Sequence, residues 1–514
     1  MNTGSNIGKV YLIGAGPGDA GLITLRGAEL LARCDVVLYD GLSNTELLAH
    51  AASAEHISVG KHGQTRIWRQ PEIIDEMLRH AQAGRVVARL KGGDPAVFAR
   101  TAEEVDALKA AQIPFEIVPG ITAALAAGSF AGIPVTHRGL ASAVALVTGH
   151  EEPGKAQSAL DWDALARFPG TLVVYMGVTT AEAWTTALIA AGKPADTPVA
   201  LVRRCSLPDQ QSIHCRLDEV ADRLTPASKF RPPVIVIIGP VTELAESMDW
   251  VSHRPLFGKT VMVTRPAAQS AEMASQLREL GAEVLIQPAI EIAAPDDWSQ
   301  VDDAIDRLQE FQTIIFCSHN AVRFFIDRMI HRGGDVRRFA GAQIAVTGSK
   351  TAQSLMDYHV RADTIPSDFR AESVVESLLH ADNAAIAGQS VLIVRADRGR
   401  DVLMDQLTAA GADVAEIAAY QNRDVDQPID GMADRIQHGD VDWITVTSSA
   451  SASNLHRMFG ESLHHSRIAS LSPITSATIR AMGFSVHAEA DPYTTESLID
   501  AIVQATSSPD RAEA

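Results

Sequence analysis

The sequence is poor in cysteine, in aromatic residues and in long apolar runs. Only four of its 514 residues are cysteines and no CxxC pair occurs, so neither a disulfide framework nor a cysteine-based metal site is expected. The longest weakly charged stretch, residues 121–135, is shorter than the ~20 residues of a membrane span and contains Pro134. Residues 1–10 lack the apolar core of a signal peptide. We therefore expect a cytoplasmic protein without a membrane partner.

Basic residues are also scarce relative to acidic ones, which argues against nucleic acid as a partner. The chain has 44 lysines and arginines against 63 aspartates and glutamates, for a formal net charge of −19. Most of the imbalance lies late in the chain: residues 1–250 hold 22 basic and 27 acidic residues, and residues 251–514 hold 22 and 36. An anionic ligand would need a local group of basic side chains to overcome this field.

Short β-branched runs alternate with Ala/Leu-rich amphipathic stretches throughout the chain. This alternation predicts an α/β fold built from βα units with mainly parallel sheets, and the length suggests three to four domains. The composition changes at residues 248–259 (MDWVSHRPLFGK), which we interpret as a junction between two halves. Representative runs are Val10–Ile13, Val36–Tyr39, Val86–Leu90, Leu172–Tyr175, Val234–Ile238, Val261–Thr264, Ile314–Phe316, Ile344–Val346, Val391–Val394 and Trp443–Val446.

The first run leads into a glycine-rich loop, GAGPGD, at residues 14–19. A strand, such a loop and a helix at residues 22–33 are reminiscent of the dinucleotide fingerprint GxGxxG. The fingerprint fails, because its third glycine is replaced by Asp19 and Pro17 removes a backbone donor. The loop suits a neutral or cationic nucleoside ligand better than a pyrophosphate. Two more glycine-rich turns follow strands, RLKGGDP at residues 89–95 and VPGITA at 118–123.

Together with other motifs, these loops resemble the tetrapyrrole C-methyltransferases. In chain order the motifs are GAGPGD, LITLRG, VVLYDGL, SVGKHG, RLKGGDP, VPGITAA, GIPVTHR, VTGH and YMG, within residues 8–246. The THR and VTGH motifs favour the uroporphyrinogen-III C-methyltransferases. The resemblance implies two α/β subdomains and methylation of uroporphyrinogen III at C2 and C7 to precorrin-2, on the branch to siroheme and cobalamin. It also implies S-adenosylmethionine as cofactor and S-adenosylhomocysteine as product.

The same resemblance implies site residues. Asp40 is implied as a proton acceptor, or alternatively it caps the following loop; Lys61 is implied as a proton donor or substrate contact, or alternatively it is a solvated charge. One departure concerns residues 203–206, which read RRCS where the family has a Gly-Thr pair, so that Arg203 and Arg204 are alternative contacts for substrate carboxylates. The implied cofactor-binding residues are Pro17, Gly92, Gly93, Asp94, Val97, Thr122, Ala123, Met176 and Cys205.

In the second half, residues 258–505, Ser, Thr and Arg gather where strands are expected to end. The carboxyl ends of parallel strands bind ligands in open α/β folds, and hydroxyls, helix N-termini and arginines suit a polyanion. The motifs of this half resemble the uroporphyrinogen-III synthases: VTRP, IIFCSHNAV, AVTGSKTA, VLIVRADRGR, EIAAYQN, ITVTSSASASNL and SLSPITSATIRAMG. The resemblance implies two α/β lobes after a linker at 247–257: lobe one from 258–290 and 420–505, and lobe two from 294–418.

The implied reaction is a dehydrating cyclisation of hydroxymethylbilane to uroporphyrinogen III with inversion of ring D. Tyr420 is expected to assist departure of the hydroxyl, or alternatively to be a packing aromatic at the hinge. The expected substrate-binding residues are Arg265, Ser318, Arg395, Ser448, Ser449, Thr475 and Ser476. The alternatives for these are ordinary helix caps for the Ser and Thr residues, and solvated charges for the arginines.

The whole chain is thus expected to be a bifunctional enzyme with small tetrapyrrole substrates, no metal, no nucleic-acid partner and a homodimer contact through the methyltransferase half. The alternative is a methylase of a later corrin precursor fused to a non-catalytic tetrapyrrole-binding module. Activity on hydroxymethylbilane separates the two.

Overall fold

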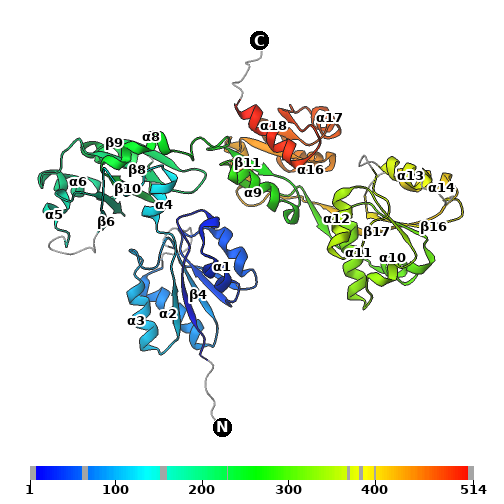
Figure 1. Cartoon of the computed structure of the whole chain (residues 1–514), viewed down its shortest axis with the longest axis horizontal. Coiled ribbons are helices and arrows are strands. Elements are labelled where there is room, and N and C mark those ends of the chain that lie inside the picture. Colours follow the sequence, from blue (N-terminus) through cyan, green and yellow to red (C-terminus); the bar gives the residue numbers. More distant parts are fainter. Residues whose placement is uncertain are drawn as a thin grey trace, which may run out of the picture. The chain divides into compact units, whose positions relative to one another are not determined.

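The computed structural model describes residues 7–60, 68–150, 159–228, 230–366, 371–380, 386–398 and 401–507. The chain divides near Lys259 into two compact units, coloured blue to green and green to red in Figure 1. Residues 276–283 group with the first unit and residues 260–275 with the second. Four five-stranded sheets form the framework of the fold. None of the helices in the described ranges is both long and apolar enough to cross a membrane.

The first sheet is parallel throughout, with the strand order β3-β2-β4-β1-β5. Residues on both of its faces are buried, for example Leu12 on one and Ile13 on the other, as expected for a parallel sheet between helices. Because the strands are parallel, the loops after β1, β2, β4 and β5 meet at one edge. The elements are β1 (Val10–Gly14), α1 (Leu25–Leu31), β2 (Val36–Tyr39), β3 (Glu55–Ser58), α2 (Gln70–Gln82), β4 (Val87–Lys91), α3 (Thr101–Ala110) and β5 (Phe115–Val118).

The second sheet, of order β6-β7-β10-β8-β9, is mostly antiparallel. Only β6 and β7 run parallel, whereas β7–β10, β10–β8 and β8–β9 are antiparallel pairs. The prediction of mainly parallel sheets does not hold for this sheet. For the β8–β9 pair the reason is the short loop 204–210, since a parallel pair needs a longer crossover. The elements are α4 (Ala123–Phe130), β6 (Val144–Thr148), α5 (Trp162–Ala166), β7 (Thr171–Tyr175), α6 (Ala181–Ala190), β8 (Pro198–Arg203), β9 (Gln211–Arg216), α7 (Val220–Arg223), β10 (Val234–Ile238) and α8 (Ala245–Met248).

The third sheet, of order β12-β11-β18-β19-β20, is built from both ends of the second half. Its core contains Met262, Ile444 and Ile468 from three neighbouring strands. Strands β18 and β19 each lead directly into a helix, so the N-termini of these helices lie at the carboxyl edge of the sheet. The elements are β11 (Thr260–Val263), α9 (Ala271–Glu279), β12 (Glu283–Ile286), α15 (Met432–Gln437), β18 (Trp443–Val446), α16 (Ser449–Phe459), β19 (Arg467–Ser470), α17 (Pro473–Ala481), β20 (Ala488–Glu489) and α18 (Thr495–Ser507).

The fourth sheet, of order β13-β17-β16-β14-β15, forms the other lobe. Its long strand β17 pairs first with β16 in parallel and then, from Gln421 to Asp424, with β13 in antiparallel fashion. The sequence analysis expected Ile290 and Tyr420 in lobe one. In the structure they lie in β13 and β17 of the fourth sheet, because β17 continues past residue 420 to Asp424. The elements are β13 (Ile290–Ala293), α10 (Ser299–Asp306), β14 (Thr313–Phe316), α11 (His319–His331), β15 (Gln343–Val346), α12 (Ser349–Asp357), α13 (Ala371–His380), β16 (Ser390–Ala396), α14 (Val402–Ala409) and β17 (Asp413–Asp424).

Candidate functional sites

The three glycine-rich loops of the first unit lie in backbone contact with one another. The Gly16 amide donates to the Gly93 carbonyl over 3.2 Å, and the Gly93 amide donates to the Gly16 carbonyl over 2.7 Å. A Cβ on Gly14 would lie 2.5 Å from the Gly120 Cα, and one on Gly120 would lie 2.3 Å from the Gly93 oxygen. Only glycine permits this approach, and the three loops together form a floor made of backbone groups.

Asp94 joins the second loop to the third. Its Oδ1 accepts from the Ala96 amide at 2.7 Å and its Oδ2 from the Gly120 amide at 2.9 Å. The structure thus gives this carboxylate a role in holding the loops, beside its implied role at the cofactor. Pro17, Gly92 and Gly93 are half-buried around the same floor.

The loop that opens helix α4 is fastened by a tyrosine which the sequence analysis did not select. The buried Tyr175 hydroxyl lies 2.6 Å from Thr122 Oγ1 and accepts a 2.9 Å hydrogen bond from the Ala124 amide. Burial raises the pKa of Tyr175, so the hydroxyl stays protonated. Tyr175 is the first residue of the quoted YMG motif, but only the fold reveals its partners. The ring of Phe98 packs against it at 5.0 Å between centroids.

Met176 and Val97 provide apolar surface next to these loops. Met176 is half exposed (49%) and adopts a left-handed backbone conformation with φ 54°, which is uncommon for a residue other than glycine. Val97 and Ala123, the first residue of helix α4, are partly buried and pack against the core. A strained, exposed methionine at a strand end is typical of a functional position.

Residues 203–206, where the sequence departs from the family pattern, contact the first glycine-rich loop at residues 14–19. Ser206 Oγ accepts from the Asp19 amide at 3.0 Å, and Cys205 Sγ lies 3.9 Å from the Ala123 carbonyl. Burial raises the pKa of the Cys205 thiol to about 12, so it remains a thiol and its contribution comes from shape and backbone. Arg204 forms an ion pair with Asp209 at 2.6 Å. The positive charge that was expected, as an alternative, to contact a substrate carboxylate is therefore already paired within the protein.

Asp40 lies at the carboxyl end of β2, beside the glycine-rich loop that follows β4. Its Oδ1 accepts a 2.5 Å hydrogen bond from Arg89 Nη2, while the carboxylate remains 31% exposed. Its backbone carbonyl accepts from the Ser43 amide, so the following turn is closed by the backbone and not by a side-chain cap. Lys61, the second implied catalytic residue, lies outside the described residues.

This set of groups fits S-adenosylmethionine. Backbone amides and carbonyls, one buried threonine hydroxyl and small or apolar side chains line the region, and none of the implied cofactor contacts is cationic. Such a lining suits a sulfonium nucleoside, whereas a pyrophosphate would need free backbone amides in the first loop, where Pro17 has none and the Asp19 amide donates to Ser206.

In the second unit, Tyr420 lies at the end of the parallel part of β17. Its hydroxyl is 3.1 Å from Ser318 Oγ, and its ring stacks on Phe324 at 5.8 Å. Burial raises the pKa of Tyr420, so the phenol is protonated at neutral pH and able to donate. Ser318 is also the N-cap of α11, accepting from the Ala321 amide at 3.1 Å.

The other selected hydroxyls differ in accessibility. Ser448 caps α16 by accepting from the Ser451 amide, and Ser449 Oγ accepts from Thr478 at 2.8 Å. Thr475 and Ser476 are buried within α17, the first bonded to Ser472 and the second to Glu489. The half-buried Ser472, the N-cap that sequence reasoning missed, is the better placed hydroxyl at this strand end.

The selected arginines also differ in how far their charge is compensated. Arg395 is buried and forms ion pairs with Asp401 at 3.1 Å and with Glu416 at 3.0 Å. Its charge is thus compensated by carboxylates of the protein itself. Arg265 is partly buried and donates to the hydroxyl of Thr495 at 3.0 Å. Burial acts on Arg265 to lower its pKa.

Three cations, Lys350, Arg265 and Arg323, act electrostatically on His319, and the sequence analysis selected only Arg265 among them. Burial lowers the pKa of His319, and the charges of Lys350, Arg265 and Arg323 lower it further. Lys350 stands in the first turn of α12 and belongs to the quoted AVTGSKTA motif. In the sequence, the one feature that could have drawn attention to Lys350 is its position two residues after Gly348, which follows strand β15.

Comparisons with known proteins follow this division of the chain. The tetrapyrrole (corrin/porphyrin) methylases match residues 9–221, and the family described as uroporphyrinogen-III synthase HemD matches residues 271–500. A porphyrin biosynthesis protein HemD of Ruminiclostridium josui is 34% identical over 86% of this chain and 87% of its own length. An S-adenosyl-L-methionine-dependent uroporphyrinogen III methyltransferase of Methanosarcina barkeri is 45% identical over 46% of this chain and 94% of its own length.

Among solved structures, the uroporphyrin-III C-methyltransferase from Thermus thermophilus complexed with S-adenosylhomocysteine is 42% identical over 46% of this chain and 94% of that chain, with a TM-score of 0.40. The described residues contain no group of three or more His, Cys, Asp or Glu side chains that could hold a metal ion. The chain belongs to the tetrapyrrole methylases through its first half and to the uroporphyrinogen-III synthases through its second, as a fusion of an S-adenosylmethionine-dependent uroporphyrinogen-III methyltransferase domain with a uroporphyrinogen-III synthase domain.

Proposed function

We propose that this chain catalyses two consecutive steps, the cyclisation of hydroxymethylbilane to uroporphyrinogen III and its methylation at C2 and C7 to precorrin-2. The observation that carries the proposal is the presence of both family domains in one chain, matched together by a relative over 86% of its length. We assign residues 8–246 to the methyltransferase, 247–257 to the linker and 258–505 to the synthase.

The test is anaerobic incubation of the full chain with hydroxymethylbilane and S-adenosylmethionine, followed by chromatographic and mass separation of the products. A dimethylated type III product is expected. Type I uroporphyrinogen alone, the product of spontaneous ring closure, would show that the second half is not a working synthase. A type III product without added methyl groups would show that the first half does not accept it.

For methylation, S-adenosylmethionine supplies an electrophilic methyl group, and the chain has to orient the reactants and take up a proton. The three glycine-rich loops, Thr122, Met176 and Cys205 would hold the cofactor. Asp40 would accept the proton that the methylated pyrrole releases, because its half-exposed carboxylate stands at the edge of the floor formed by these loops. Lys61 remains a proposed proton donor or substrate contact.

Replacement Asp40→Asn tests this role. We expect kcat for methylation to fall by about 10²–10⁴, the usual contribution of a positioned base, while S-adenosylhomocysteine affinity measured by calorimetry stays within about twofold of the wild type. An unchanged kcat would remove Asp40 as the base. A parallel loss of cofactor affinity would assign it to binding instead.

For ring closure, Tyr420 would donate a hydrogen bond to the departing hydroxyl, with Ser318 orienting the phenol. The helix N-termini capped by Ser318, Ser448 and Ser472 would face carboxylates of the substrate, since amide groups there favour negative charge. Folding of the substrate and exclusion of water would supply the remainder of the catalysis.

We further propose a cytoplasmic homodimer formed through the methyltransferase half. The family resemblance supports the dimer, and light scattering coupled to size exclusion tests it: a mass of twice 54.9 kDa is expected. A single-chain mass at micromolar concentration would contradict it.

A further inference from the structure

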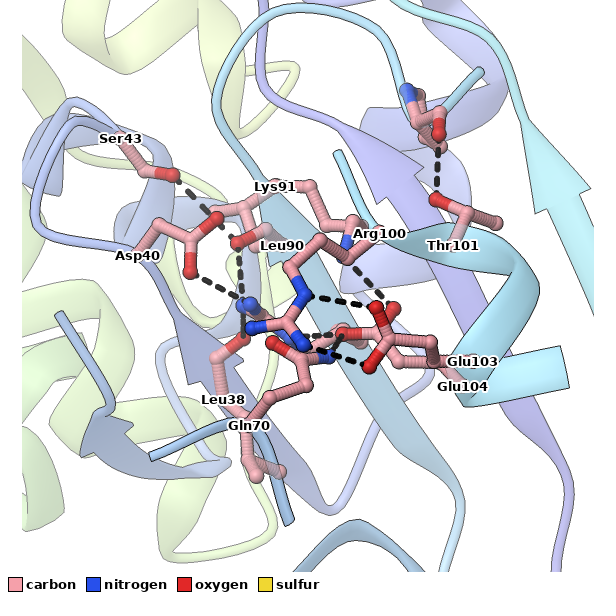
Figure 2. A network of polar contacts seen from close by, with 12 residues as sticks. Leu38, Asp40, Ser43, Gln70, Leu90, Lys91, Arg100, Thr101, Glu103 and Glu104 are labelled. Carbon is pink, nitrogen blue, oxygen red and sulfur yellow. Dashed lines mark hydrogen bonds and ion pairs between the residues drawn. The ribbon is translucent and has the colours of Figure 1, made fainter. Parts of the chain in front are cut away.

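A buried cluster of charges lies directly behind Asp40. At its centre is Glu104 of helix α3, whose side chain is fully buried (Figure 2). Glu104 Oε1 accepts from Arg89 Nε at 3.2 Å and from Gln70 Nε2 at 3.1 Å, and its Oε2 accepts from Lys91 Nζ at 2.7 Å. One carboxylate therefore serves two cations that strand β4 presents side by side.

Arg89 connects this cluster to Asp40. Its side chain is 3% exposed, and each of its three nitrogens has a separate acceptor. Nε donates to Glu104, Nη1 to the Leu90 carbonyl at 3.1 Å, and Nη2 to Asp40 Oδ1 at 2.5 Å. Because the guanidinium is planar and rigid, only one orientation satisfies all three acceptors. Asp40 Oδ2 has no hydrogen-bond partner among the described residues.

We propose that Glu104 is a positioning residue for methylation: acting through Arg89, it fixes the Asp40 carboxylate with Oδ1 occupied and Oδ2 free to accept the proton from the substrate. This inference rests on the proposed role of Asp40 as the base and deepens it. Glu104 itself touches neither substrate nor cofactor, since its side chain has no exposed surface.

The balance of charge supports this role. The charged groups of the cluster are Asp40 from β2, Arg89 and Lys91 from β4 and Glu104 from α3; Gln70 from α2 is neutral. Burial lowers the pKa of Lys91, and the adjacent positive charge of Arg89 lowers it further. When Asp40 becomes protonated, Glu104 is the one carboxylate of this cluster, among the residues that the structure describes, left to hold both cations in place.

A purely structural role would not require these residue types. Buried ion pairs are often replaced by apolar side chains of similar volume without loss of stability, because desolvation offsets much of the attraction. Apolar residues could join β4 to α3, but they could not hold the guanidinium in one plane against Asp40. The arrangement therefore serves the orientation of the partly exposed carboxylate at its end.

A double-mutant cycle on the full chain tests the inference. Glu104→Gln, Asp40→Asn and the double variant are assayed anaerobically for methylation of uroporphyrinogen III, with S-adenosylhomocysteine affinity measured by calorimetry. We expect Glu104→Gln to lower kcat about tenfold or more, the scale of a small misplacement of a catalytic group, with KM and cofactor affinity within about twofold. In the Asp40→Asn background the same change should lower kcat less than about twofold, because Glu104 acts through Asp40.

The matched control is Glu103→Gln, one residue earlier on α3. Its carboxylate is 48% exposed and pairs with Arg100 at the surface, so kcat should not change. Glu104→Asp keeps the charge with a shorter reach and should retain more activity than Glu104→Gln. If Glu104→Gln does not fold, the cycle is run with Glu104→Asp.

The results separate the inference from its basis. The role of Glu104 would be overturned, with Asp40 still the base, by any of three outcomes. These are a kcat of Glu104→Gln equal to that of the wild type, equal losses of kcat and cofactor affinity in Glu104→Gln, or a kcat of the double variant lowered by the product of the two single effects. A wild-type kcat in Asp40→Asn would overturn both.

Discussion

The hydroxyl of Tyr175 is predicted to hold the cofactor loop at Thr122 in place. In Tyr175→Phe the ring, its contact with Phe98 and the strand end all remain, and only the hydroxyl is lost. Two buried groups then lack their partner: the Ala124 amide, now 2.9 Å from the hydroxyl, and Thr122 Oγ1 at 2.6 Å. The substitution therefore isolates the effect of two hydrogen bonds.

The magnitude follows from the cost of unpaired buried polar groups. Leaving one such donor unsatisfied costs about 1–3 kcal/mol, and the loop is expected to move so that these groups reach water. Cofactor binding must then restore the loop, which we expect to weaken S-adenosylhomocysteine binding by about 1.4 kcal/mol, or tenfold in Kd. Calorimetric titration of the full chain measures this directly.

The reciprocal control is Tyr420→Phe, another buried tyrosine in the synthase half. It should leave the Kd for S-adenosylhomocysteine within about twofold of wild type, just as Tyr175→Phe should leave the rate of ring closure unchanged. A Kd for Tyr175→Phe within twofold of wild type would refute the reasoning, since the loop would then keep its conformation without the hydroxyl.

Two further predictions concern the synthase half. Tyr420→Phe should slow enzymatic conversion of hydroxymethylbilane to the type III product without changing methylation of supplied uroporphyrinogen III; a full-rate variant would return Tyr420 to a packing role against Phe324. Because burial and the charge of Lys350 lower the pKa of His319, the folded chain resists its protonation, whereas the unfolded chain takes up a proton near pH 6.5. His319 thus contributes stability above that pH which is progressively lost as the pH falls below it, and His319→Gln should show a smaller acid-induced fall in the thermal midpoint; an identical fall would contradict this.

The sequence predicted the three glycine-rich loops that the structure brings together, because local patterns determine them. Each glycine-rich loop follows a β-branched strand, and parallel strands bring such loops to one edge. The close approach of Gly14 to Gly120 explains why the patterns contain glycine at those places. Tyr175 and Glu104 escaped prediction, since a buried hydroxyl and a buried carboxylate acquire meaning only from partners that lie far away in sequence.

The errors have a similar origin. Two successive strands can pair in parallel only if a long connection, usually a helix, separates them. The loop 204–210 between β8 and β9 is too short for this, and the two strands pair in antiparallel fashion. The lobe boundary expected at residue 420 falls within one strand, β17, which pairs with β16 through its first part and with β13 through its last. Thr475 and Ser476 were selected by residue type, which does not predict burial; both are buried in helix α17, and their role as substrate contacts stays a prediction.

Charge shows most clearly why residue type alone does not identify a polyanion site. Residues 251–514 carry 22 basic and 36 acidic residues, so most arginines there have a carboxylate nearby, as Arg395 and Arg398 do. Arg323 and Lys350, by contrast, form no ion pair with any described residue, and both act electrostatically on His319. In a half with this excess of acid, a basic residue that forms no direct ion pair is a stronger indication of a carboxylate-binding surface than the number of arginines at strand ends.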